Sequence, residues 1–307
     1  MVNSILKVQN LTHYYGNKVA VNDISLEIKS NGVLGLLGSN GAGKSTTINI
    51  LCGVLSPTKG DVFINGINIR NNQIASKKLI GFLPQKAPLY FDLTVNEYLE
   101  YCAKIRLIPN VKIRNAVERV KQLCNISHFS KALIRSLSGG YQQRVGIAQA
   151  IIHDPKLVVF DEPTNGLDPV QVLEVRKLIQ TISKDRAVLL STHILSEVQA
   201  TCSNIIMIEK GNKVFSGSIE DFNNYVAPNT LSIKMILPPE LEEFLLICGV
   251  EEVDFKNEII LVKTNDIIKT SKAIIERSIK SNWGLIEIFP LKNSLDDVFA
   301  ELSSSIN

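Results

Sequence analysis

Runs of apolar residues divide the first part of the chain into strands and helices. Ile24, Leu26 and Ile28 alternate with polar residues, the period of two that predicts a strand with one buried face. Other runs are apolar throughout, which is typical of central parallel strands buried on both faces: 33–37, 157–160 and 187–190. Residues 172–182 instead repeat apolar side chains at helical spacing. Together these patterns predict an α/β domain with a parallel core sheet and an antiparallel β part.

A helical region interrupts the strand pattern further along. Thr94 followed by Glu97 resembles a capping box at the start of a helix. A later helical face is apolar at Ile113 and Val117. We therefore expect a helical subdomain, residues 86–155, inserted between two strands of the core.

A second, smaller domain is predicted at the C-terminal end. The periodic signal falls over residues 220–228, so we expect one domain over residues 1–224 and another over 225–307. The second domain follows the order strand (230–236), helix (from 240), strand (251–255), strand (259–263), helix (267–279) and strand (285–289). A last helix is predicted over 295–302, capped by Ser294. This is the ferredoxin-like α+β order. It contains no catalytic constellation, which indicates an accessory or interaction domain.

Composition narrows the class of protein. The 307 residues carry a net charge of +3, too small to predict nucleic-acid binding. Five cysteines are scattered without a C-x-x-C pair, which favours buried thiols in a reducing compartment over a disulfide framework or a zinc site. The N-terminus lacks the apolar core of a signal peptide, and no apolar run approaches the ~20 residues of a membrane helix. We therefore expect any membrane spans to come from another chain.

A glycine-rich loop follows the apolar run 33–37 and precedes a helical pattern. In that context G-x-x-x-x-G-K-[ST] is a phosphate-binding loop, and the matching residues are Gly38, Ser39, Asn40, Gly41, Ala42, Gly43, Lys44, Ser45 and Thr46. Glycines let several backbone N–H groups converge on one anion, and the new helix adds the positive end of its dipole. Lys44 can reach the β- and γ-phosphates, and the Ser45 hydroxyl can bind Mg²⁺.

Polar residues end two of the predicted core strands. Asp161 and Glu162 follow the run 157–160, where a ligand is expected at the carboxyl edge of an α/β sheet. Asp161 can hold Mg²⁺, commonly through water, and Glu162 can polarise an attacking water. His193 ends the next core strand at the same edge and is a candidate partner of a γ-phosphate.

Four further features are weaker when each is taken alone. Gln85 ends a predicted strand, where a glutamine is usually structural. Tyr15 can stack on an adenine ring or pack as an ordinary turn residue. Asp168, which precedes a proline, predicts a helix N-cap, and that cap is a sufficient structural explanation. The segment Ser138–Gly140 begins another helix and is a second candidate anion site.

Taken together, these motifs resemble the ATP-binding subunit of an ABC transporter, over about residues 5–220. Gly38–Thr46 matches the family's phosphate loop and Leu137–Arg144 its signature sequence. Asp161 and Glu162 match the second acidic motif, and Gln85 matches the Q-loop glutamine. Tyr15 matches the adenine-stacking aromatic, Gly166–Asp168 the D-loop, and His193 the switch histidine. The six motifs other than the aromatic follow the family's order along the chain, which makes the resemblance highly specific.

The resemblance implies a P-loop NTPase cassette that binds ATP and Mg²⁺ and hydrolyses ATP. Two copies of the chain would face head to tail, so that Ser138, Gly139 and Gly140 of one copy close over the ATP on the other's phosphate loop. Glu162 would then orient water, His193 would contact the γ-phosphate, and Gln85 would sense Mg²⁺. The other partner would be a separate transmembrane permease, with this chain peripheral at the cytoplasmic face of the membrane. No nucleic-acid partner is expected.

The subgroup and the alternatives rest on fewer residues. The aromatic turn, the D-loop and the C-terminal extension resemble the drug and antibiotic exporter group. Tyr141 stands where the signature commonly has Gln, while the adjoining Ser-Gly-Gly is unaltered. The alternatives are a soluble ABC ATPase acting on ribosomes or nucleic acid, a kinase built on the same loop, and a regulatory binding module. A single cassette with an ordinary helical insert disfavours the first. A kinase would not need the Ser-Gly-Gly motif or His193, and the presence of both Glu162 and His193 disfavours the regulatory module.

Overall fold

The computed structural model describes residues 4–225, 229–256 and 259–291. Within them the chain forms two compact units, the first ending at Glu220 and the second beginning at Asp221. This division falls inside helix α8 (Ile219–Tyr225), and the proposed domain boundary between residues 224 and 225 stays a prediction. Each unit has its own hydrophobic core.

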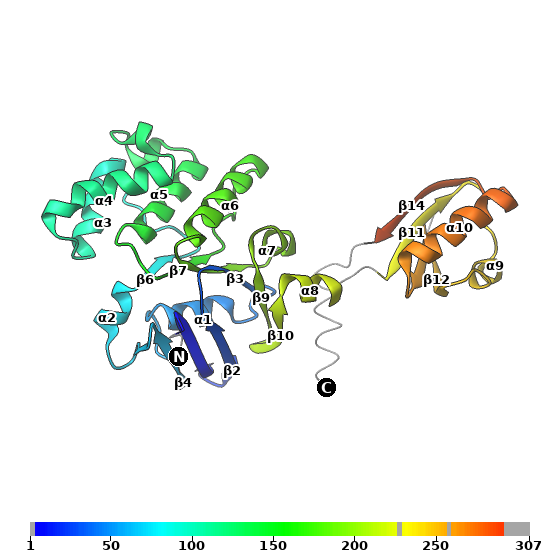
Figure 1. Cartoon of the computed structure of the whole chain (residues 1–307), viewed down its shortest axis with the longest axis horizontal. Coiled ribbons are helices and arrows are strands. Elements are labelled where there is room, and N and C mark those ends of the chain that lie inside the picture. Colours follow the sequence, from blue (N-terminus) through cyan, green and yellow to red (C-terminus); the bar gives the residue numbers. More distant parts are fainter. Residues whose placement is uncertain (1–3, 226–228, 257–258, 292–307) are drawn as a thin grey trace. The chain divides into compact units, whose positions relative to one another are not determined.

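A six-stranded sheet forms the centre of the first unit (Figure 1). Its strands lie in the order β10-β9-β3-β8-β7-β6, and all neighbours are parallel except β10, which pairs antiparallel with β9. The bounds are β3 (Gly32–Leu37), β6 (Ile80–Leu83), β7 (Leu157–Asp161), β8 (Ala187–Thr192), β9 (Asn204–Glu209) and β10 (Asn212–Ser218). Because β3, β8 and β7 are parallel neighbours, the residues that follow them meet at one edge of the sheet. The three apolar runs are thereby confirmed as central strands.

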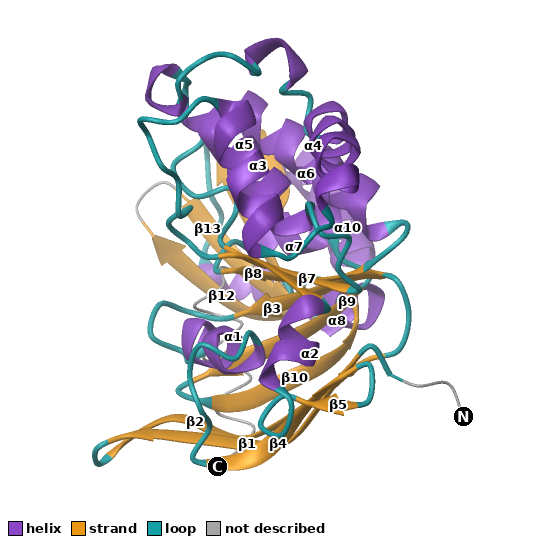
Figure 2. Ribbon diagram, turned by 90° about the vertical axis from the view of Figure 1, so that its left-hand side faces the viewer, coloured by secondary structure: helices purple, strands orange, loops and turns teal. Residues whose placement is uncertain are grey.

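An antiparallel sheet packs against the same core. Its order is β2-β1-β4-β5, with Leu6 opposite Ile28 across the first pair. The bounds are β1 (Leu6–Tyr15), β2 (Lys18–Ile28), β4 (Lys59–Ile64) and β5 (Ile67–Asn68). Helix α1 (Lys44–Leu51) lies between the two sheets, and its Ile48 and Leu51 belong to one cluster of buried residues contributed by both (Figure 2). The helix is shorter than its apolar pattern, since Leu55 lies beyond its end.

The remaining helices of the first unit cover the central sheet or form the helical insert. Thr94 caps α3 with the predicted capping box, in which its hydroxyl and backbone N–H pair with Glu97. Helices α3, α4 and α5 cluster together, as Figure 1 shows. The bounds are α2 (Gln73–Lys78), α3 (Val95–Ile105), α4 (Asn110–Leu123), α5 (Gly139–Ile151), α6 (Pro169–Ser183) and α7 (Leu195–Thr201), with 3₁₀ turns at Ser127–Phe129 and Ile134–Ser136.

The second unit has the predicted ferredoxin-like order. Its antiparallel sheet runs β12-β13-β11-β14, and its core includes Phe244 of α9 and Ile274 of α10, with Trp283 beside them. The bounds are β11 (Thr230–Met235), α9 (Leu241–Leu245), β12 (Val250–Lys256), β13 (Ile259–Thr264), α10 (Ile267–Ser281) and β14 (Leu285–Leu291). The helix predicted over 295–302 lies outside the described residues.

Candidate active site

The glycine loop leaves β3 and enters α1, and two of its three glycines have no space for a side chain. A Cβ atom on Gly38 would lie 2.5 Å from the carbonyl oxygen of Ile208, and one on Gly43 would lie 2.5 Å from that of Ala20. Gly43 also has a φ of 107°, which disfavours any L side chain. The loop backbone is therefore held tightly between β9 and β2, with its N–H groups available to an anion.

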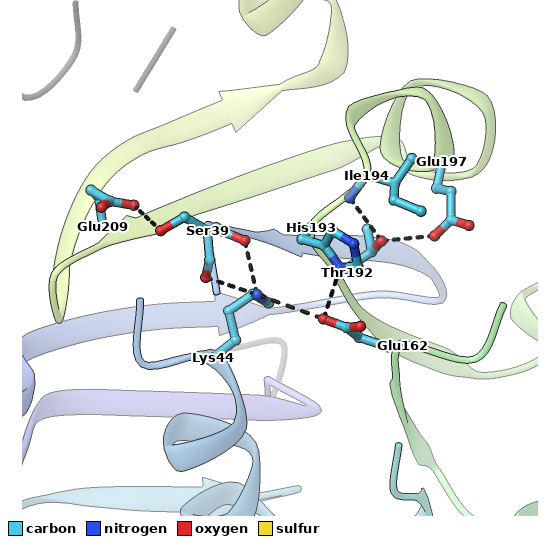
Figure 3. A network of polar contacts seen from close by, with 9 residues as sticks. Ser39, Lys44, Glu162, Thr192, His193, Ile194, Glu197 and Glu209 are labelled. Carbon is cyan, nitrogen blue, oxygen red and sulfur yellow. Dashed lines mark hydrogen bonds and ion pairs between the residues drawn. The ribbon is translucent and has the colours of Figure 1, made fainter. Parts of the chain in front are cut away.

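Lys44 lies at the centre of this loop. Its side chain is only 5% exposed, and its Nζ donates to the carbonyl oxygens of Gly38 (2.8 Å) and Ser39 (3.1 Å). Glu162 Oε1 lies 3.8 Å from the same nitrogen (Figure 3). Burial lowers the pKa of Lys44, and the carboxylate of Glu162 is the largest opposing influence. A buried cation whose ion-pair carboxylate lies as far as 3.8 Å away is suited to a further anionic partner.

The backbone conformation of Glu162 orients its carboxylate. Glu162 has a φ of 49°, an unusual left-handed conformation that turns the chain as it leaves β7. Its N–H donates to Ser191 O of β8 at 2.9 Å. His193 Nδ1 lies 3.0 Å from Glu162 Oε1, so this nitrogen carries the hydrogen and donates to the carboxylate. The glutamate is thus fixed between a lysine and a histidine.

Asp161 fits a metal-binding role. Its Oδ1 atom is buried and has no hydrogen-bond partner among the residues described here. Burial raises its pKa, while the hydroxyls of Ser191 and Ser45 act in the opposite direction. A single buried carboxylate oxygen near a phosphate-loop serine is the donor set that Mg²⁺ uses when substrate phosphates complete its coordination. The residues present therefore fit Mg²⁺.

One cavity of about 590 Å³ joins most of the predicted nucleotide-site residues. Tyr15, 52% exposed, lies at its wall, and Glu162 and Gln85 line it together with the phosphate loop. The loop residues in its wall are Asn40, Gly41, Gly43, Lys44, Ser45 and Thr46. Lys18 and Lys210 also line it, although the sequence patterns did not single them out. Both add positive charge to a cavity that already suits phosphates.

The second predicted anion site lies in a different cavity. Ser138 occupies the N-cap of α5 without a side-chain cap bond, and it lines a cavity of about 600 Å³ with Gly140 and Tyr141. Asp168 lines it too, and its Oδ1 accepts from Gln171 N at 2.9 Å, which confirms the predicted N-cap of α6. This cavity shares no lining residue with the one at the phosphate loop.

A buried glutamate that sequence reasoning missed connects two of the functional segments. Glu197 of α7 accepts hydrogen bonds from Thr164, in the loop after Glu162, and from Thr192, just before His193. The Thr192 hydroxyl in turn accepts from Ile194 N at 3.0 Å (Figure 3). Since Glu197 is 2% exposed, this network fixes the loop carrying Glu162 relative to the end of β8.

Replacing Glu197 by Ala is expected to lower the free energy of unfolding by about 1–3 kcal/mol, because two buried hydroxyls lose their acceptor. ATP hydrolysis should also fall at temperatures where the variant is folded, since His193 loses its support. Urea denaturation and a phosphate-release assay measure the two effects. Glu242→Ala, at an exposed position of α9, is the control. Equal unfolding energies for the two variants would show that the network does not stabilise the fold.

The buried Asp161 predicts a gain of stability on its replacement by Asn. Because burial raises the pKa of Asp161, the folded chain holds the proton of this carboxyl more tightly than the unfolded chain does. The protonated carboxyl therefore adds to the free energy of unfolding at low pH, and this contribution is lost as the pH rises through the folded-state pKa. Asn does not ionise, so Asp161→Asn should raise the melting temperature of the nucleotide-free chain at pH 7. The gain should vanish as the pH falls to about 4, the ordinary range of an Asp carboxyl. A lower melting temperature than wild type at pH 7 would refute this reasoning.

The fold and the site together define a nucleoside triphosphatase of the phosphate-loop type. The sequence profile of the protein family described as "ABC transporter" matches residues 21–165 of this chain. The bacitracin transport ATP-binding protein BcrA of Bacillus licheniformis is 37% identical over 212 residues, 68% of either chain. The uncharacterized ABC transporter ATP-binding protein YhcH of Bacillus subtilis is 31% identical, with 98% of this chain and 96% of that protein covered.

A solved structure agrees with these relatives. The structure of cbiO1 from Clostridium perfringens, described as part of the ABC transporter complex cbiONQ, matches with a TM-score of 0.67 and 29% identity. The match covers 72% of this chain and 91% of that one. The chain therefore belongs to the ABC transporter ATP-binding proteins, and it is an ATP-binding, ATP-hydrolysing subunit of such a transporter. Within the described ranges no helix is both long and apolar enough to span a bilayer.

Proposed function

We propose that this subunit powers an exporter. It binds ATP with Mg²⁺, pairs head to tail with a second copy of itself, and drives a separate transmembrane permease from the cytoplasmic face of the membrane. The observation that carries the head-to-tail pairing is the separation of two anion sites on one chain. The phosphate loop lines one cavity and Ser138 with Gly140 lines another, with no residue in common.

A two-fold dimer accounts for this separation. Gly139 at the start of α5 is exposed, and a Cβ atom there would meet no atom of the described residues within 4 Å. The helix N-terminus therefore presents free N–H groups outward, where they suit an anion carried by another molecule. In a C₂ pairing each copy offers its signature segment to the other's nucleotide, so one interface contains two ATP sites.

The chemistry proposed for this site is positioning and charge stabilisation. Glu162 orients the attacking water and accepts its proton. His193, which donates to Glu162 at 3.0 Å, holds that carboxylate and contacts the γ-phosphate. Lys44 stabilises the charge that develops on the β- and γ-phosphate oxygens. Tyr15 stacks on the adenine, and Asp168 lies next to the signature segment at the dimer interface.

Mg²⁺ would be held by Asp161, Ser45 and Gln85. Asp161 supplies the buried carboxylate oxygen described above, and the other two residues line the nucleotide cavity. When bound, Mg²⁺ neutralises phosphate charge during transfer. Gln85 follows β6 and therefore connects the metal to the helical insert, which is the route proposed for coupling to the permease.

The exporter assignment rests on the relatives and on the subgroup resemblance. The relative named for bacitracin transport supports an antibiotic-export role. The net charge of only +3 gives no reason to expect a nucleic-acid partner. A soluble ABC ATPase that acts on ribosomes or nucleic acid is the alternative. It would not need a permease.

A tagged pull-down from detergent-solubilised membranes of the native host distinguishes the two. The transporter proposal predicts a polytopic membrane protein in comparable amount, whose sequence would then open the question of substrate. Recovery of only soluble partners or ribosomes would overturn the transport role and leave the ATPase chemistry intact. A chain with Thr94 and Glu97 both replaced by Ala is a useful second bait, because it perturbs the helical insert without touching the nucleotide cavity.

A further inference from the structure

A separate cavity in the first unit has four cationic side chains in its lining. It has a volume of about 680 Å³ and lies where the end of α3, the start of α4 and the end of α5 meet α2. We call it the basic pocket, and its cationic residues are Lys78, Arg106, Lys112 and Arg119. It shares no lining residue with the nucleotide cavity or with the cavity at Ser138.

The positive charge of the basic pocket is largely uncompensated. Its single acidic residue is Asp154, so four cations and one carboxylate leave an excess of three (4 − 1), equal to the +3 of the whole chain. Asp154 is already bound by Arg186, outside the pocket lining, and lies 3.7 Å from Arg119. Neither Lys78 nor Lys112 has an acidic partner in the described part of the chain. A concave surface with one sign of charge concentrates the field on an incoming anion.

Arg106 lies deepest in this group. Its Nη1 donates to the carbonyl oxygens of Lys77 (3.1 Å) and Ile80 (3.4 Å), and both of these contacts use that one nitrogen. Burial lowers the pKa of Arg106, which reflects the cost of holding a guanidinium away from water. An anion in the pocket would offset that cost and could accept from the rest of the planar fork.

Uncharged groups of the basic pocket also suit a phosphate. Helix α4 begins after Pro109, which lines the pocket, and it has no side-chain cap and no acidic residue in its first turn, so the positive end of its dipole favours an anion nearby. His153 donates from Nε2 to Ile80 O at 3.0 Å, and its buried Nδ1 has no partner among the described residues. His153 lines the pocket, so its ring can report on an anion bound there.

We propose that the basic pocket binds a phosphate-bearing anion at a site independent of ATP. The phosphate belongs either to a small soluble molecule or to a lipid headgroup, and the same cations serve both. Arginine forks, lysine point charges and a helix N-terminus together match the multiple oxygens of a phosphate better than a single carboxylate.

Histidine ring NMR locates the binding, because the chain has only four histidines and one lies in each site of interest. His153 lines the basic pocket, and His193 contacts Glu162 at the nucleotide site. Inorganic pyrophosphate is the probe, and the full chain is titrated. The proposal predicts a saturable shift of the His153 ring signals with its own affinity, distinct from any shift of His193.

Paired lysine variants supply the control. Lys78→Ala with Lys112→Ala should weaken the His153 response at least tenfold and leave the His193 response unchanged. Lys104→Ala with Lys131→Ala removes the same charge from exposed positions outside the pocket and should change neither. Both pairs replace exposed side chains, so folding is preserved.

Vesicles distinguish the source of the phosphate. A lipid headgroup is the source if pyrophosphate leaves the His153 signals unchanged and the wild-type chain sediments with phosphatidylglycerol vesicles but not with phosphatidylcholine vesicles. In that case the Lys78 and Lys112 pair variant should not sediment with phosphatidylglycerol vesicles. If neither probe distinguishes the pocket variant from the Lys104 and Lys131 control, the proposal is wrong.

Discussion

Glu162→Gln is expected to bind ATP as tightly as the wild-type chain and to hydrolyse it about 10²–10⁴ times more slowly. The amide keeps the size of the side chain and accepts the hydrogen bond from His193. It cannot take a proton from water, and it removes the charge 3.8 Å from Lys44. Nucleotide affinity by calorimetry and phosphate release under saturating ATP measure the two effects separately.

Glu209→Gln is the matched control for this prediction. Glu209 also carries negative charge near Lys44 and accepts a hydrogen bond from Ser39 at 2.7 Å, but it has no contact with His193 among the described residues. Its replacement should change the hydrolysis rate less than tenfold. Near-normal turnover by Glu162→Gln, or equal losses in both variants, would remove Glu162 from the proposed role.

Gly139→Asp is expected to fold and to bind ATP normally while losing hydrolysis by about 10²–10³. A side chain at this position has open space in its own chain, and Gly139 does not have a positive φ. In the proposed dimer, however, the new carboxylate would face the γ-phosphate on the other copy. The charge repulsion should therefore act only on the assembled state.

Two variants separate charge from crowding. Gly139→Asn has nearly the same shape without the charge and should retain more activity than Gly139→Asp. Gly140→Ala tests the neighbouring position, where a Cβ atom would lie 2.6 Å from the Gln171 side chain of the same chain, so its effect should include a loss of stability. If Gly139→Asp hydrolyses ATP at the wild-type rate, the signature segment does not face a nucleotide.

Much of the site was predictable because each motif carries its own local signal. The acids at the end of β7 follow a run of apolar residues that only a buried central strand explains. Asp168 and Pro169 specify a helix start by sequence alone, and the structure has that cap. The ferredoxin-like order was predictable because its strands and helices alternate with clear periods.

The rest depends on contacts between residues far apart in the sequence. Glu197 lies on a helix of seven residues, too short to show a periodic face, and its partner Thr164 is 33 positions away. Lys210 reaches the nucleotide cavity only because β9 pairs with β3. The left-handed φ of Glu162 has no sequence signal, since glutamate rarely adopts it. The cations of the basic pocket come from three separate segments, namely α2, the C-cap of α3 and α4.

The mass of the Glu162→Gln chain in solution, with and without ATP and Mg²⁺, is the most direct test of the proposed head-to-tail dimer. Light scattering after gel filtration should give the 34.0 kDa of one chain without nucleotide and twice that mass with it. Adding Gly139→Asp to the same chain should abolish the shift. A chain that remains at 34.0 kDa under saturating ATP while the wild type hydrolyses ATP at full rate would contradict the account, because catalysis would then need no second copy.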